Sequence, residues 1–307
     1  MPKLHIEKSI LVDKPIAEIY NKLNNYNHWT PWSPWIITDP DAKVTIAEDA
    51  KSYEWTGPVT GDGKMAIFNE VENERIDIDL TFLKPWKSTA KVWFRFKEEG
   101  QSTRVYWGMD SSLPFFLFFI KNMMTAMIGM DYDRGLNMFK EYAEEGKVNS
   151  ELTFEGHKTF NGCEYVGIKT STTIDKISDA MKKDYTILME HIMDKHQDKV
   201  AGNAFSIYHK WDPVKNIVEY TAAVPVSGDI EMLPKMIKGS YPKTKVFTVH
   251  HKGPYKHVGN AWSAQYGRKQ AKVIDVNKKL HPIEEYLNSP TNTAENELES
   301  KVHFAVK

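Results

Sequence analysis

Residues 75–82, RIDIDLTF, alternate without a break between polar and apolar side chains. The apolar ones, from Ile76 to Phe82, fall on one face of an extended chain, and the polar ones fall on the other. A strand with this period of two buries one face and leaves the other in water, which is typical of an antiparallel sheet. The stretch therefore predicts such a sheet in the first half of the chain.

The segments around this strand complete an α+β layout. A short helix is expected after Pro15, and a long helical pattern follows the strands and ends at Gly146, a residue type common just past a helix end. This order predicts a curved antiparallel sheet that wraps the last helix. The expected strands are residues 4–12, 91–97 and 103–110, and the long helix is residues 115–145.

The composition limits the classes of function. With 307 residues the chain is long enough for two domains. Its net charge of -1 gives no excess of positive charge for binding nucleic acid. Cys163 is the only cysteine, which excludes an intramolecular disulfide and a cysteine-based zinc site. No phosphate-binding loop or metal motif occurs, so we expect no cofactor, no metal and no nucleic-acid partner. The first residues lack a signal-peptide core, and we expect a cytoplasmic protein.

One apolar segment, Leu113–Met130, is almost long enough to cross a membrane. Lys121 and Asn122 lie at its centre, where a charge is costly in lipid. The segment is therefore interpreted as a buried or cavity-covering helix, and no membrane is expected as a partner.

A polar stretch at residues 147–160 is predicted to link the first domain, residues 1–146, to a second domain at residues 161–307. The second domain shows two consecutive strand–helix–strand–strand patterns. The expected strands are residues 165–170, 205–210, 217–226, 245–250, 284–287 and 301–306, and the helices are residues 173–199 and the segment after Tyr255. Glu190, His191 and Asp194 are interpreted as a solvated helix face.

The first half resembles the START/SRPBCC (polyketide cyclase-like) helix-grip family. The resemblance covers residues 1–146 and is carried by the opening SILVDKPIAEIYNKLNNYNHWTPWSPW, the strand Tyr53–Gly57 and the ending Asp131–Leu136. It implies a curved sheet gripping the long C-terminal helix, with room for a lipid or a polyketide-like molecule.

The second half resembles the GyrI-like effector-binding family. His251-x-Gly253-Pro254-Tyr255 and the stretch from Glu284 to Pro290 resemble its His-x-Gly-Pro-Tyr and Glu-x-Tyr-Leu-Asn-Asp-Pro motifs, with Ser289 in place of the usual Asp. The chain departs from the pattern in the charged run QAKVIDVNKKLHP and in lacking a proline-rich run before the last strand. Many relatives carry a DNA-binding module, and no helix-turn-helix is recognised in this sequence.

Glu284 is the principal candidate for a binding residue. It shares a strand face with Tyr286, and a carboxylate beside aromatic rings suits a flat or cationic organic ligand. The resemblance implies that Glu284 lies in the ligand pocket, whereas the residues alone favour a solvent-exposed side chain. The other candidates can line a pocket or simply pack: Tyr208, Tyr220, Tyr255, Trp262, Phe205 and His251, of which His251 can instead hydrogen-bond its own loop.

In the first half, tryptophans and methionines suggest an adaptable apolar cavity, although an ordinary aromatic core explains them as well. These residues are Trp29, Trp32, Trp55, Trp93, Trp107, Met123 and Met127.

The sequence favours a small-molecule binding protein of the sensor or sequestering type over two alternatives. The first alternative is a hydrolase of reactive electrophilic compounds that uses Glu284, and the second is a co-chaperone-like interaction module. An oligomer or a protein partner is left open.

Overall fold

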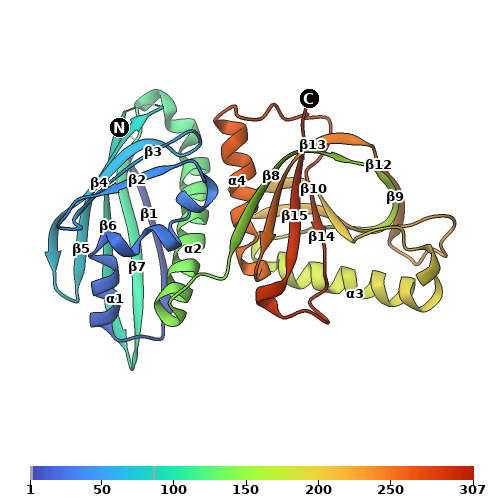
Figure 1. Ribbon diagram of the computed structural model, residues 1–307, viewed down its shortest axis with the longest axis horizontal. Coiled ribbons are helices and arrows are strands. Elements are labelled where there is room, and N and C mark those ends of the chain that lie inside the picture. Colours follow the sequence, from blue (N-terminus) through green and yellow to red (C-terminus); the bar gives the residue numbers. More distant parts are fainter. Residues whose placement is uncertain (1–2, 86) are drawn as a thin grey trace. The chain divides into compact units, whose positions relative to one another are not determined.

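The computed structural model describes residues 3–85 and 87–307, and it divides into two compact units, residues 1–149 and 150–307 (Figure 1). Each unit has its own antiparallel sheet and its own helices. The chain is therefore an α+β protein with two separate sheets.

The first unit contains a seven-stranded sheet in the order β1-β7-β6-β5-β4-β3-β2. The stretch RIDIDLTF lies in β5, and Ile76 and Ile78 are fully buried as the alternation predicts. Asp77, on the opposite face, is also buried because Arg75 and Asn69 hold its carboxylate at 2.7 and 2.8 Å. The strands are β1 (Lys3–Val12), β2 (Lys43–Ile46), β3 (Ser52–Gly57), β4 (Gly61–Val71), β5 (Arg75–Lys84), β6 (Ser88–Glu99) and β7 (Ser102–Ser112).

Helices of the first unit are α1 (Ile16–Leu23) and α2 (Lys121–Glu145), and short 3-10 turns link α1 to β2. The long helix expected from residue 115 begins later, because Phe115–Ile120 form the 3-10 turn η4 before α2 starts at Lys121. Gly146 ends α2 in the left-handed conformation, as the sequence predicts.

The second unit contains an eight-stranded sheet in the order β12-β9-β11-β10-β14-β15-β13-β8. Two helices, α3 (Ile177–Lys195) and α4 (Gly259–Gln270), pack on the sheet. The strands are β8 (Glu151–Phe160), β9 (Cys163–Thr172), β10 (Phe205–Asp212), β11 (Ile217–Pro225), β12 (Met236–Tyr241), β13 (Thr244–Lys252), β14 (Ile283–Tyr286) and β15 (Glu299–Ala305).

This sheet is built from two copies of one strand–helix–strand–strand pattern. The first copy is β9-α3-β10-β11 and the second is β13-α4-β14-β15, and they meet where β10 pairs antiparallel with β14. The remaining strands are exchanged: β8 precedes the first copy but pairs with the second, and β12 precedes the second copy but pairs with the first. Ser206 of β10 lies opposite Glu284 of β14 at the junction.

The expectation of a linker over residues 147–160 is wrong, because residues 151–160 form the edge strand β8. Leu152 and Phe154 pack against the cluster that includes Val249, whereas Phe160 packs against another cluster. A bulge near Gly156, whose φ is +74°, shifts the register between these residues. The bulge breaks the alternation, so the segment does not show the pattern of a strand. The edge strand β12 is also absent from the expected elements.

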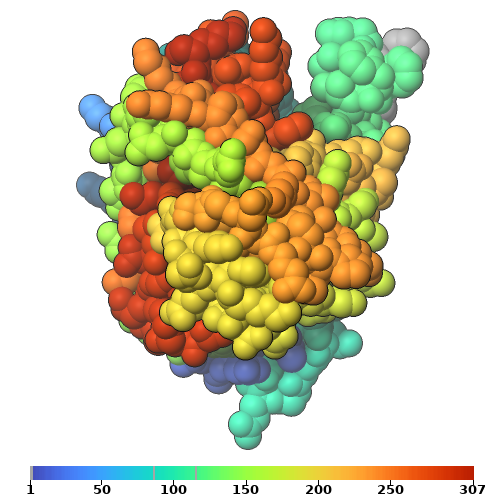
Figure 2. Space-filling model, turned by 90° about the vertical axis from the view of Figure 1, so that its right-hand side faces the viewer, coloured from blue at the N-terminus to red at the C-terminus, as the bar shows by residue number. Residues whose placement is uncertain are grey.

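His191 does not lie on a solvated face. Its side chain is buried, and Nε2 lies 2.7 Å from the Glu231 carbonyl oxygen, while His196 accepts from the Glu231 N–H at 3.2 Å. Figure 2 shows the yellow surface of this part of the chain beside the orange surface of the residues that follow β11. The chain after β11 therefore covers the end of α3.

Among the helices in residues 3–85 and 87–307, none combines the length and the apolar character that a membrane crossing requires.

Candidate ligand-binding site

Glu284 lies beneath a set of aromatic side chains at the junction of the two repeats. Its side chain is 2% exposed, and its Oε2 accepts hydrogen bonds from Trp262 Nε1 at 2.5 Å and from the Tyr208 hydroxyl at 3.4 Å. Trp262 reaches the carboxylate from α4, and Tyr208 reaches it from β10. The two repeats thus both contribute donors to one carboxylate.

The hydrogen-bond partners of this carboxylate in the described residues are neutral. Within the described residues, no Lys, Arg or His side chain forms an ion pair with Glu284. Burial raises the pKa of Glu284 to about 7, while hydrogen bonds from Trp262, Tyr286 and Tyr208 act in the opposite direction. The carboxylate therefore changes its charge near neutral pH and carries a negative charge that the protein itself does not balance.

A second hydrogen-bonded group forms around Ser206, directly across the strand pair from Glu284. The Ser206 hydroxyl lies 2.9 Å from the Tyr185 hydroxyl and 3.0 Å from the Tyr286 hydroxyl. Met181 of α3 contacts this group, since its sulfur lies 3.9 Å from the Tyr286 oxygen and 4.0 Å from the Tyr208 oxygen. Helix α3 therefore covers the Ser206 side as α4 covers the Glu284 side.

The rings of this group meet mainly edge to face. Ring centroids are 4.5 Å apart for Tyr208 and Trp262, 5.5 Å for Tyr185 and Tyr286, and 5.7 Å for Tyr255 and Tyr286. All five residues are partly exposed as whole residues, whereas Glu284 is buried. Burial raises the pKa of Tyr255 to about 12, and the other tyrosines shift upward for the same reason. Their hydroxyls are therefore hydrogen-bond donors at neutral pH.

Five of the residues expected at the site gather here: Glu284, Tyr286, Tyr208, Trp262 and Tyr255. Two others do not. Phe205 is on the opposite face of β10 from Ser206 and packs with Tyr165 and Ile283. Tyr220 of β11 pairs with Tyr208 and shares its face of the sheet. Its hydroxyl, however, donates to Asp184 at 2.7 Å, and its side chain is fully buried.

His251 belongs to a different polar cluster. It is fully buried, and its Nε2 lies 3.2 Å from Ser150 Oγ, which also bonds Asn260 Nδ2 at 3.0 Å. Burial, together with the neighbouring His257 and His250, lowers the pKa of His251 to about 3, so the ring is neutral at pH 7. These contacts tie the start of the unit to the first turn of α4.

Residues 157–307 match the family described as the GyrI-like small molecule binding domain. The second unit is a GyrI-like domain. A comparison with curated proteins finds no match.

Matches among solved structures include the EcmrR–DNA complex, at 18% identity over 62% of this chain and 69% of that one, with a TM-score of 0.44. The EcmrR C-terminal domain matches at 19% identity over 52% of this chain and 98% of its own, with a TM-score of 0.42. The Aha1 dimer from Colwellia psychrerythraea matches at 14% identity over 47% and 98%, with a TM-score of 0.36.

Sequence reasoning missed four residues of the GyrI-like domain that the fold brings to this region: Met181, Tyr185, Asp184 and Ser206. Met181 and Tyr185 lie four residues apart in the predicted helix over residues 173–199, which puts them on one face of that helix, but this spacing does not show that they lie over β10. Ser206 lies between apolar residues on a strand and carries no signal of its own.

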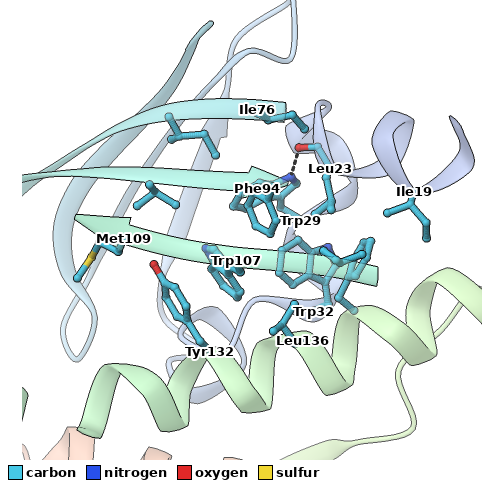
Figure 3. Packing of buried hydrophobic residues seen from close by; sticks show 14 of the residues in the cluster. Ile19, Leu23, Trp29, Trp32, Ile76, Phe94, Trp107, Met109, Tyr132 and Leu136 are labelled. Carbon is cyan, nitrogen blue, oxygen red and sulfur yellow. Dashed lines mark hydrogen bonds between the residues drawn. The ribbon is translucent and has the colours of Figure 1, made fainter. Parts of the chain in front are cut away.

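In the first unit, three of the expected cavity residues fill the core instead. Trp29, Trp32 and Trp107 are at most 4% exposed, and Trp107 stacks on Tyr132 with the ring centroids 4.0 Å apart (Figure 3). Trp29 donates from Nε1 to the Leu23 carbonyl at 3.0 Å, as Figure 3 shows. The buried indole nitrogens of Trp32 and Trp107 have no hydrogen-bond partner among the residues that the structure describes.

The remaining expected cavity residues lie in other surroundings. Trp55 is half-buried at the margin of this core. Trp93 is on the other face of the sheet, where Gly108 leaves room for its ring, and it donates to Asp110 at 3.0 Å. Met123 and Met127 are 43% and 40% exposed on α2.

Proposed function

We propose that this protein binds a flat organic cation in its GyrI-like domain, with Glu284 as the counter-charge. One observation carries the proposal: in the part of the chain that the structure describes, the buried Glu284 carboxylate accepts hydrogen bonds only from neutral donors, and it lies beside partly exposed aromatic residues. A bound cation balances the carboxylate charge, and the ring faces add cation–π and dispersion attraction. The family match, which covers residues 157–307 of this unit, supports small-molecule binding.

The test is a thermal-shift titration with rhodamine 6G, a planar aromatic cation, checked by its fluorescence anisotropy. We expect the cation to raise the melting temperature of the full chain, because a ligand that binds the folded state stabilises it. Glu284→Gln should abolish the shift. A neutral planar compound of similar size should give a much smaller shift with the parent chain.

Glu285→Gln is the matched control, because Glu285 is the next residue but faces the other way. Its carboxylate lies 2.9 Å from Asn203 Nδ2 and 3.2 Å from His303 Nε2. We expect this variant to keep the cation-dependent shift. Equal shifts in Glu284→Gln and Glu285→Gln would contradict the assignment of Glu284 as the counter-charge.

A hydrolase of electrophilic compounds is the second candidate, favoured by the pKa of Glu284 near 7 and by the nearby Tyr208 hydroxyl. A carboxylate with this pKa can take a proton from water as the water oxygen attacks a strained ring carbon. The ring carbon–carbon bond breaks as the new carbon–oxygen bond forms, a tyrosine hydroxyl donates its proton to the departing carbon, and the proton held by Glu284 returns to the tyrosinate. Chromatography of a cyclopropane-bearing electrophile with parent and Glu284→Gln protein tests this, since only turnover that is lost in the variant supports it.

For the first unit we propose the helix-grip architecture over residues 1–146. The single sheet with α2 along one face supports it. The buried indole nitrogens of Trp32 and Trp107, which lack partners, are compatible with a bound molecule that carries an acceptor.

A further inference from the structure

The start of the long helix in the first unit carries a stripe of exposed apolar side chains. Phe116, Phe119, Met123 and Met127 follow one another at spacings of three and four residues, so they share one face of the helical segment. Their exposed fractions are 71%, 69%, 43% and 40%. We call these four residues the apolar stripe.

The face of the segment that is turned toward the sheet is apolar as well. Ile128 packs against the aromatic core, and Tyr132 and Leu136 on the following turns of α2 are buried in it. A helix that covers a sheet normally presents polar residues on its outer face. Apolar character on both faces at the start of α2 therefore means that packing within this unit does not account for the outer stripe.

The charges around the stripe are positive. No Asp or Glu occurs between Asp110 and Asp131, and Lys121 lies within that stretch. Lys3 and Lys87 are exposed at the same end of the sheet, since Lys3 pairs with Ser112 at the end of β7 and Lys87 directly precedes β6.

The acidic residues at that end are already engaged. Asp62 is paired with Lys84 at 2.7 Å, and Asp110 lies 2.7 Å from the His5 ring nitrogen and accepts from Trp93. The surroundings of the stripe therefore offer lysine charge that is not offset by neighbouring carboxylates on the same segment.

We propose that the apolar stripe docks on the surface of an anionic lipid bilayer. Phenylalanine and methionine side chains enter the boundary between headgroups and acyl chains, while Lys3, Lys87 and Lys121 contact the anionic headgroups. Lys121 excluded a spanning helix in the sequence, but in this arrangement it lies at the headgroup level, where a lysine is favourable. The docked segment lies in the plane of the interface and does not cross the membrane.

Vesicle flotation of the full chain tests the proposal. Vesicles of phosphatidylcholine with about one third phosphatidylglycerol should carry the protein upward, and pure phosphatidylcholine vesicles should carry much less. The double variant Phe116→Ser, Phe119→Ser should reduce the bound fraction at least tenfold. Lys121→Gln should weaken binding to the anionic vesicles by roughly fivefold, the factor for one lysine at such a surface.

Phe68→Ser is the matched control, because Phe68 is 54% exposed on β4, outside the apolar stripe. This variant should float like the parent protein, and all variants should keep their melting temperature within about 2 °C, as surface substitutions usually do. Absence of flotation with anionic vesicles would overturn the proposal. So would a concentration-dependent dimer that the double variant abolishes in analytical ultracentrifugation, because the stripe would then bind a second copy of the chain.

Discussion

Ser206 and Glu284 lie directly opposite each other where the two repeats of the second unit join. Two residues farther along each strand comes a tyrosine, Tyr208 after Ser206 and Tyr286 after Glu284. Each tyrosine turns toward the opposite repeat: Tyr208 bonds Glu284, and Tyr286 bonds Ser206. The duplicated pattern thus places equivalent rings on both sides of a single acidic group.

Cation binding should depend on pH through Glu284. Because the pKa of this carboxyl is raised to about 7, its ionised form predominates only above that pH. We expect the affinity for a permanent cation to be constant above about pH 8 and to fall roughly tenfold per unit well below pH 7. Anisotropy titrations with rhodamine 6G from pH 5 to pH 9 measure this. A flat profile in the parent protein would contradict a role for the Glu284 charge.

Glu284 should also make folding stability depend on pH in the absence of ligand. A raised pKa means that the folded chain holds this proton more tightly than the unfolded chain does. The stabilising contribution is therefore complete below about pH 4.5 and is lost as the pH rises through about 7, by roughly 3 kcal/mol in total. Urea denaturation should show that the free energy of unfolding of Glu284→Gln rises relative to that of the parent protein as the pH increases from about 4.5 to about 7. A constant difference between the two would be evidence against the raised pKa.

Trp262→Phe should weaken cation binding by keeping the ring but removing the donor to Glu284. The Trp262 Nε1 hydrogen bond favours the ionised carboxylate, so its loss raises the pKa of Glu284 further. We expect roughly tenfold weaker binding at pH 7 and a smaller deficit at pH 9. Calorimetry at both pH values distinguishes this from a simple loss of ring contact, which would weaken binding equally at each.

Tyr220→Phe should affect stability but not binding. The Tyr220 hydroxyl and Thr170 both donate to the buried Asp184 carboxylate at 2.7 Å. Removal of one donor leaves that carboxylate underpaired, at a cost of about 1–3 kcal/mol. The free energy of unfolding should fall by that amount while the cation-dependent shift persists. Loss of the shift in a folded variant would instead place Tyr220 in the site.

Gly135→Ala should destabilise the first unit by about 1–3 kcal/mol, despite the better helix propensity of alanine. A Cβ at this position would lie 2.7 Å from the Trp107 ring and 3.1 Å from Pro34. Gly129→Ala is the control, because its Cβ would meet only the end of the flexible Lys8 side chain, at 3.2 Å. Chemical denaturation should separate the two variants, and equal stabilities would show that the core around Trp107 adapts.

Several features of this protein follow from local sequence alone. The period-two pattern of β5 and the helical spacing of apolar side chains in α3 identify a strand and a helix without reference to the rest of the chain. The motifs around His251 and Glu284 point to a GyrI-like domain, which the family match confirms for residues 157–307. The shared face of Glu284 and Tyr286 follows from their spacing, because side chains on a strand alternate between its faces.

The membership of the candidate site was decided by the tertiary structure. Pairing of β10 with β14 brings Ser206 to Glu284 and directs Phe205 to the opposite face, and packing of α3 adds Met181 and Tyr185. Strand register and helix placement depend on contacts between segments that are far apart in the chain, so no local pattern encodes them. The burial that shifts the pKa of Glu284 arises in the same way, because it requires side chains from both repeats.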